Sequence, residues 1–271
     1  MLKKKPILSI EHVSKQYLLS TRETIDALKD VNFEVHEGEF VSLIGPSGCG
    51  KSTLIKLLAG LLKPTAGRVL EYGKQIDGDS HDRGVVFQHY NLFPWLTVED
   101  NIGFGLFIRN TAPDKRSQIV AHYIEAIGLK GFEKAYPKEL SGGMQQRVAL
   151  GRAFATNPKI LLMDEPFAAL DVQTKRLMQD LFLQILQYEP RTVVFVTHDV
   201  EEAVFLGDNV YILAPSPGTI REKVTVNLPR PRDLKTEFSQ SFIEIKRYVQ
   251  GVVTKESLGS VKLDLEIYKN L

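Results

Sequence analysis

A glycine-rich loop near the N-terminus has the residue types and spacing of a phosphate cradle. It fits the pattern G-x-x-x-x-G-K-[ST] and consists of Gly45, Pro46, Ser47, Gly48, Cys49, Gly50, Lys51, Ser52 and Thr53. Glycines allow consecutive backbone N–H groups to curl around phosphate oxygens. We expect Lys51 to reach the β- and γ-phosphates of a nucleotide and the Ser52 hydroxyl to ligate Mg²⁺. We interpret Cys49 as a small filling residue, because no partner base for it is identifiable.

Two adjacent carboxylates close an apolar run farther along the chain, "ILLMDEP" at residues 160–166. Asp164, at the end of a buried strand, suits a Mg²⁺ contact, usually through water. Glu165 is expected to polarise an attacking water as a general base. A solvated strand end would also carry such a pair, but the phosphate loop in the same chain favours the catalytic interpretation.

Two further polar residues follow apolar runs. His198 closes "TVVFVTH" and Gln88 closes "GVVFQ". A lone histidine is more often a structural hydrogen-bonding group than a catalyst. Open α/β sheets, however, bind ligands at the carboxyl ends of their strands. We therefore expect His198 to sense a γ-phosphate and Gln88 to meet Mg²⁺ or the attacking water.

The elements that must position these residues alternate between short apolar runs and helical patterns. Runs that are apolar throughout are typical of parallel strands covered on both faces. Strand patterns disappear between residues 88 and 157, where three helical segments are predicted: 96–110, 114–129 and 141–155. We therefore predict an α/β core interrupted by a helical subdomain, with these bounds: core 1–88 and 158–228, subdomain 89–157, and a C-terminal tail 229–271.

The tail begins with the turn-rich stretch "PRPRD" at residues 229–233. Apolar residues then recur at helical spacing, which predicts a helix. We expect that helix to pack on the core through Phe238, Phe242, Ile245 and Val249.

Composition excludes several classes of protein. The 271 residues are 43% hydrophobic and 25% charged, an ordinary globular balance, and the formal net charge of +1 provides no strong field for nucleic acid or anionic lipid. No apolar run approaches the ~20 residues that span a bilayer. The single cysteine excludes an intrachain disulfide and fits a reducing compartment. We expect a soluble, cytoplasmic protein whose membrane role, if any, comes through a partner.

Together these residues resemble those of ABC-transporter ATPase subunits, from about residue 7 to about residue 219. "GPSGCGKST" resembles the Walker A motif, and "ILLMDEP" the Walker B motif with its catalytic glutamate. Gln88 matches the Q-loop, His198 the switch histidine, "LSGGMQQ" the ABC signature and "ALD", residues 169–171, the D-loop. Tyr17 falls where the family has an adenine-stacking aromatic, although a core tyrosine at a strand end is the alternative. The resemblance implies an α/β fold: a RecA-like P-loop NTPase core, an N-terminal antiparallel β part and an inserted helical subdomain.

The signature adds a second glycine-rich turn, and the resemblance implies that it serves a neighbouring chain. Two copies would pair as a homodimer around two ATP, and each ATP would be contacted in trans by Ser141, Gly142, Gly143, Gln145 and Asp171. Ser141 is a good helix N-cap, and the helix that begins there offers unpaired N–H groups to an anion. Two glycines cost a helix ~0.5–1 kcal/mol each against alanine, which favours close approach to a ligand over simple capping.

Within this superfamily the chain most resembles the nitrate/sulfonate/taurine importer group, through "NLFPWLTVEDNI", "YPKELSGGMQQRVALGRA" and "MDEPFAALD". That resemblance implies an ATP- and Mg²⁺-dependent ATPase at the inner face of the cell membrane. Its partners would be integral-membrane permease subunits that dock from Gln88 to Val98 and, indirectly, a solute-binding protein. Phe93 and Trp95 would either meet the permease or pack inside the subdomain.

The alternative is an ABC ATPase that acts without a permease, as a clamp in DNA or ribosome maintenance. Members of the DNA-repair class separate the ATPase motifs by long coiled coils or zinc modules, and this sequence has no heptad run and no cysteine cluster. Ribosome-associated members usually join two cassettes, and this sequence has one set of motifs. We therefore favour the transporter and expect no nucleic-acid partner.

Overall fold

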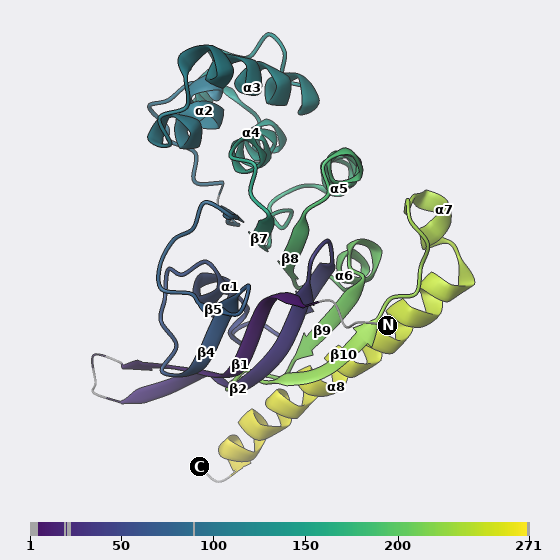
Figure 1. Cartoon of the computed structure of the whole chain (residues 1–271). Coiled ribbons are helices and arrows are strands. Elements are labelled where there is room, and N and C mark those ends of the chain that lie inside the picture. Colours follow the sequence, from purple (N-terminus) through teal and green to yellow (C-terminus); the bar gives the residue numbers. More distant parts are fainter. Residues whose placement is uncertain (1–4, 19, 21–22, 89, 270–271) are drawn as a thin grey trace. The chain divides into compact units, whose positions relative to one another are not determined.

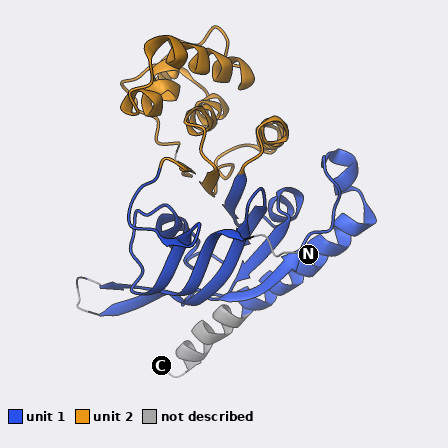
Figure 2. Ribbon diagram, viewed as in Figure 1, with its two compact units in different colours: residues 1–80, 192–271 blue, residues 81–191 orange. Residues whose placement is uncertain are grey.

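The computed structural model describes residues 5–18, 20, 23–88 and 90–269, with side chains described as far as residue 258. The chain divides into two compact units, residues 1–80 with 192–271, and residues 81–191 (Figure 2). These bounds differ from those expected for the core and the subdomain. Strands β6 and β7 pair with each other, and helix α4 contacts β6, so the second unit includes strands as well as helices.

The first unit contains the antiparallel sheet, which confirms the expected N-terminal β part (Figure 1). Its strand order is β2-β1-β4-β5, and the bounds are β1 Pro6–Leu18, β2 Thr24–His36, β4 Ala66–Glu71 and β5 Lys74–Gln75. Long strands β1 and β2 pair almost end to end, as far as Leu18 opposite Thr24.

The same unit contains a second group of strands in the order β10-β9-β3-β8. Their bounds are β3 Phe40–Ile44, β8 Thr192–Thr197, β9 Asn209–Leu213 and β10 Ile220–Thr225. The parallel strands β3 and β8 are buried at every residue, as their continuous apolar runs predict. Helices α1, Lys51–Leu58, and α6, Val200–Leu206, pack against these strands.

Helix α1 ends at Leu58, although the helical spacing of its leucines continues to Leu61. Gly60 takes a positive φ of 78°, and a Cβ at that position would lie 1.9 Å from the carbonyl oxygen of Gly78. The chain must therefore turn here, because only glycine fits the conformation and the space.

The tail forms two helices, α7 Leu234–Glu237 and α8 Gln240–Lys269. Phe242 and Val249 of α8 are buried, and the Phe242 ring lies 6.5 Å from that of Phe205 in α6. The prediction that Phe238 packs on the core is wrong, because its side chain is 80% exposed. Phe238 lies between the two helices, and α8 begins only after Ser239, whose Oγ accepts a hydrogen bond from Phe242 N.

The second unit pairs β6, Arg83–Val86, with β7, Ile160–Asp164, in parallel. Its helices are α2 Val98–Ile108, α3 Pro113–Ala126, α4 Gly142–Ala155 and α5 Val172–Tyr188, with a 3₁₀ turn at Pro137–Glu139. Helix α4 contacts α2, α3 and α5, and the Phe182 ring of α5 packs edge-on against Phe154 and Phe167. No strand occurs among described residues 90–157, and no described helix is long and apolar enough to cross a membrane.

Candidate functional site

The glycine-rich loop connects β3 to α1 in the first unit. Gly48 and Gly50 both have left-handed φ angles, 78° and 91°. A Cβ at Gly50 would lie 2.7 Å from Ala27 O, and one at Gly45 would lie 2.8 Å from Leu213 O. The loop is thus confined between two neighbouring backbones, and side chains at these glycines would force it open.

The Lys51 ammonium lies inside the curl of this loop. Lys51 is only 6% exposed, and its Nζ donates hydrogen bonds to Gly45 O at 2.8 Å and Pro46 O at 3.0 Å. Cys49 is fully buried beside it, and this burial raises the pKa of the thiol. The thiol therefore stays protonated at neutral pH, which suits a filling residue and not a nucleophile.

Tyr17 lies at the end of β1, beside the first turn of α1. Its hydroxyl is 3.3 Å from Thr53 Oγ1, and Lys15 Nζ lies 5.5 Å from the centroid of its ring. The residue is 36% exposed, so its ring is not enclosed in the core. An accessible aromatic face next to a phosphate loop has the geometry on which a purine base can stack.

His198 leaves the sheet next to the phosphate loop. Strand residues Ile44 and Thr197 are partners in the parallel pairing of β3 with β8, so Gly45 and His198 follow at the same edge. The side chain of His198 is exposed. Its position is held from both sides, because Asp199 N donates to Thr197 Oγ1 at 3.0 Å and Thr197 Oγ1 donates to Glu202 at 2.5 Å.

Asp164 and Glu165 lie in the second unit, where β7 ends. Val86 of β6 pairs with Met163 of β7. Gln88 and Glu165 each lie two residues after this pair, so both follow the sheet at the same edge. Asp164 is 7% exposed, whereas Gln88 is exposed. Glu165 has a φ of 47°, a left-handed conformation that is costly for a residue with a side chain and that persists mainly at functional sites.

A buried glutamine, the last residue of the signature "LSGGMQQ", holds the turn after Glu165, a role that the sequence patterns did not predict. Gln146 of α4 is fully buried and donates from Nε2 to Pro166 O at 2.6 Å. It connects helix α4, which begins within the signature, to the turn that carries the two carboxylates. The detectable signal was a polar residue at a position of α4 that helical periodicity assigns to the apolar face.

The two glycines of the signature differ in their surroundings. Ser141 caps α4 by accepting a hydrogen bond from Met144 N at 3.3 Å. A Cβ at Gly143 would lie 2.7 Å from Thr174 Cγ2, so the packing of α4 on α5 already requires glycine there. A Cβ at Gly142 would meet no heavy atom closer than Tyr90 Oη at 3.9 Å, so the fold itself leaves room at that position.

Gln145 and Asp171, which were predicted to contact the ATP of a neighbouring chain, make hydrogen bonds within their own chain. Gln145 donates from Nε2 to Pro137 O at 2.9 Å and thereby fixes the turn before α4. Asp171 caps α5 by accepting from Gln173 N and Thr174 N, at 3.1 and 3.0 Å. The hydrogen bonds from Thr174 and Gln173 lower the pKa of the Asp171 carboxyl.

The described residues offer hydroxyl and carboxylate groups suited to Mg²⁺ but no ready-made cluster of metal ligands. Among described residues, no group of three or more His, Cys, Asp or Glu could hold an ion by itself. Mg²⁺ at nucleotide sites is held by one or two protein groups together with phosphates and water. Ser52, at the start of α1, and the buried Asp164 provide the oxygen donors that such an ion prefers.

The model of the ABC transporter family matches residues 28–168. The chain belongs to the ABC transporter family. It is 48% identical to an uncharacterised ABC transporter ATP-binding protein of Methanocaldococcus jannaschii, over 94% of both chains. It is 45% identical to the nitrate import ATP-binding protein NrtD of Synechocystis, over 87% of this chain and 92% of that protein. It is 44% identical to the aliphatic sulfonates import ATP-binding protein SsuB of Bacillus cereus, over 89% and 94%.

Solved structures of ABC proteins share the fold. A dimeric ATP-binding cassette in a post-hydrolysis state with ADP and Pi superposes with a TM-score of 0.73 at 34% identity, over 82% of this chain and 100% of the other. The cbiO1 protein of Clostridium perfringens, part of the ABC transporter complex cbiONQ, gives 0.73 at 26% identity, over 89% and 93%. The ABC ATPase cassette fold expected from the motifs is therefore confirmed, and the chain is an ABC-type ATPase.

Proposed function

We propose that this ABC ATPase drives the import of a small anion such as nitrate, a sulfonate or taurine through a separate membrane permease. The observation that carries the proposal is the similarity, over most of both chains, to ATP-binding proteins of nitrate and sulfonate import. The alternative, an ABC ATPase without a permease, lacks such support among these relatives.

The geometry of the phosphate loop supports its role in holding ATP. The Lys51 ammonium contacts two carbonyl oxygens of the loop, and it would exchange these contacts for phosphate oxygens when ATP binds. Mg²⁺ would be held by Ser52, Gln88 and Asp164, and it would neutralise charge on the phosphates. Glu165 would orient and deprotonate the attacking water, and His198 would contact the γ-phosphate.

Two copies of the chain would complete each site. The room beside Gly142 supports the approach of a partner's nucleotide to the N-terminus of α4, where unpaired N–H groups attract phosphate. A related cassette is dimeric with ADP and Pi bound. Ser141, Gly142 and Gly143 would meet the γ-phosphate of the other copy, with Gln145 and Asp171 in supporting positions.

The permease would dock on the helical part, from Gln88 to Val98. Trp95 is 70% exposed there, whereas Phe93 packs against Phe104 with ring centroids 4.4 Å apart. Of the two aromatic residues in this turn, Phe93 thus serves internal packing and Trp95 is available to a partner.

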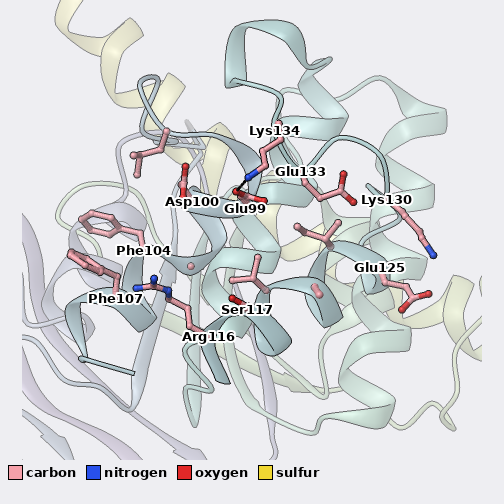
Figure 3. Close-up of a pocket in the computed structure, with 15 residues that line it drawn as sticks. Glu99, Asp100, Phe104, Phe107, Arg116, Ser117, Glu125, Lys130, Glu133 and Lys134 are labelled. Atoms are coloured by element: carbon pink, nitrogen blue, oxygen red, sulfur yellow. Dashed lines mark hydrogen bonds and ion pairs between the residues drawn. The ribbon is translucent and has the colours of Figure 1, made fainter. Parts of the chain in front are cut away.

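A pocket of about 890 Å³ next to this segment supports the same docking face. It is lined by Leu96 and by residues of α2, α3 and the loop that follows α3. Figure 3 shows Phe104 and Phe107 lying together on one side, close to Arg116, whose guanidinium is 5.5 Å from the Phe107 ring. Phe107 is 60% exposed. A cytoplasmic helix of a permease that presents apolar side chains would cover this surface.

The experiment is purification of the tagged chain from detergent-solubilised membranes, followed by uptake assays with nitrate, taurine and an alkanesulfonate. We expect integral-membrane subunits to co-purify and uptake of one of these anions to depend on the chain. Lys51→Ala should abolish both nucleotide binding and uptake, whereas Lys56→Ala, at an exposed position of the same helix, should change neither. Purification of the chain without membrane subunits would contradict the proposal, and so would uptake that persists in the Lys51→Ala variant.

A further inference from the structure

The stretch "PRPRD", residues 229–233, lies against helix α6 in the first unit. Arg232 is 5% exposed, and its Nη1 donates to three carbonyl oxygens at the C-terminal end of α6. These are Val204 O at 3.1 Å, Phe205 O at 2.9 Å and Gly207 O at 2.7 Å. A tail residue thus satisfies the carbonyls that a helix leaves without an intrahelical partner.

The chemistry of this contact requires an arginine. A cation is stabilised at a helix C-terminus, and the planar guanidinium presents several N–H groups in a fixed fork that an ammonium cannot reproduce. Burial, and secondarily the neighbouring Arg230, lower the pKa of Arg232 to about 10, and Asp208 acts in the opposite direction. The charge therefore persists at neutral pH in a place where burying it is costly.

Asp208 links the same contact to the strand that carries the phosphate loop. Its Oδ1 accepts from Arg230 Nη2 at 2.7 Å and lies 3.6 Å from Arg232 Nη2. Its Oδ2 accepts from the backbone N of Phe40, the first residue of β3, at 2.9 Å. We call Arg230, Arg232 and Asp208 the arginine clamp.

The opposite end of α6 begins directly after His198. Asp199 caps the helix by accepting from Glu201 N at 2.9 Å, and Glu202 accepts from Thr197 Oγ1. The side chains of both neighbours of His198, Thr197 and Asp199, are therefore hydrogen-bonded to α6. A shift of this short helix along its axis would move the histidine with it.

The long helix α8 holds α6 from the side. Phe242 packs against Phe205, and Lys246 pairs with Glu201 in the first turn of α6. Figure 1 shows α8 running along β9 and β10 in this unit, and α8 contacts both α6 and β9. Helix α6 is thus fixed at its C-terminal end by the arginine clamp and along its flank by α8.

We propose that the C-terminal tail positions His198 for ATP hydrolysis through α6, with Arg232 as the positioning residue. The inference rests on the proposed ATPase role of His198, and it assigns to the tail a part in turnover that nucleotide binding does not need. Arg232 touches neither nucleotide nor reacting atoms. It sets the axial position of α6, and through Asp208 it ties that position to β3.

The test compares steady-state ATPase kinetics of the full chain with Arg232→Met and Arg232→Lys. We expect both variants to keep KM and ATP-binding stoichiometry but to lose kcat about tenfold or more, since small displacements of a catalytic group carry costs of that order. The matched control is Arg221→Ala, which breaks an ion pair between β10 and α8, with Glu256, and leaves α6 untouched. It should change neither parameter.

A double-mutant cycle separates positioning from general destabilisation. If Arg232 acts through His198, Arg232→Met should have little further effect on single-turnover hydrolysis in a His198→Ala background. Equal losses of kcat in both backgrounds, or unchanged kcat in the single variant, would overturn the inference. Absence of ATPase activity in the unaltered chain would instead contradict the proposed function, so the two failures are distinguishable.

Arg230→Ala keeps the inference testable if the Arg232 variants do not fold. Arg230 has a 39% exposed side chain and donates to Asp208 and to Leu206 O at 2.7 Å, so its removal weakens the clamp without leaving a buried cavity. We expect a smaller loss of kcat with unchanged KM and faster hydrogen exchange in the first turn of α6. Unchanged exchange and unchanged kcat would overturn the proposal.

Discussion

The hydroxyl groups of Tyr17 and Thr53 lie 3.3 Å apart, so the end of β1 meets the first turn of the helix that follows the phosphate loop. Strand β2 approaches the same loop from behind, because a Cβ at Gly50 would lie 2.7 Å from Ala27 O. The antiparallel sheet therefore lies directly beside the phosphate loop, and the ring of Tyr17 lies at the edge of that sheet.

Replacing Tyr17 by alanine should weaken ATP binding by about tenfold, since the stacking of a base on an aromatic ring is worth ~1–3 kcal/mol. Tyr17→Phe should bind nearly as well as the unaltered chain, because the ring and not the hydroxyl carries the effect. Calorimetric titration with ATP and with triphosphate alone provides the measurement. Tyr188→Ala, at an exposed position of α5, is the control. An equal loss for triphosphate would show that Tyr17 acts on the loop and not on the base.

Glu165→Gln should give a dimer that ATP stabilises and that does not turn over. The substitution keeps the size of the side chain and its left-handed backbone but removes the base, so we expect a loss of at least ~100-fold in kcat. Sizing chromatography with ATP and Mg²⁺ should show the dimer, and Glu37→Gln, on the exposed surface, should behave like the unaltered chain. A monomer with nucleotide bound would rule out the shared site.

Gly142→Leu should leave ATP binding by the monomer intact and remove both dimerisation and turnover. The nearest heavy atom to a Cβ at this position is 3.9 Å away, so the chain's own fold tolerates the side chain while a partner's nucleotide would not. Gly142→Ala should show a milder effect in the same sizing and ATPase assays. Gly143→Ala is the comparison variant. Its methyl group would lie 2.7 Å from Thr174 Cγ2, so this substitution should lower the thermal stability of the fold. Dimer formation by Gly142→Leu would disprove the trans contact.

Asp171→Ala should lower the free energy of unfolding at neutral pH, because α5 loses its N-cap. The folded-state pKa of Asp171 lies below its ordinary value of 3.8, so the ionised cap stabilises the fold above that value. The contribution is lost as the pH falls through the lowered pKa. Denaturant titrations at pH 7 and at successively lower pH below 4 should therefore show the difference between the two proteins shrinking with acid. A difference independent of pH would mean that ionisation of Asp171 does not matter.

Local chemistry could be predicted from the sequence because each piece of it occupies a short, contiguous stretch. The phosphate loop needs glycines and a lysine in one turn, and the fully apolar runs of β3 and β8 specify buried strands wherever they pair. Asp164 and Glu165 follow such a run directly. The antiparallel part and the cassette fold were expected from the resemblance of these motifs to those of ABC-transporter ATPase subunits.

Tertiary structure alone decided the contacts between residues far apart in the chain. Helix α1 ends where it does because Gly60 packs against the backbone of Gly78. Residue 143 must be glycine because Thr174 packs against it. The exposure of Phe238 depends on α8 beginning after Ser239, a boundary that apolar spacing cannot locate. Arg232 reached the carbonyls of α6 only because the fold brings the tail back to that helix. Periodicity and composition describe what a segment can form, whereas which buried donor meets which acceptor is fixed when the whole chain packs.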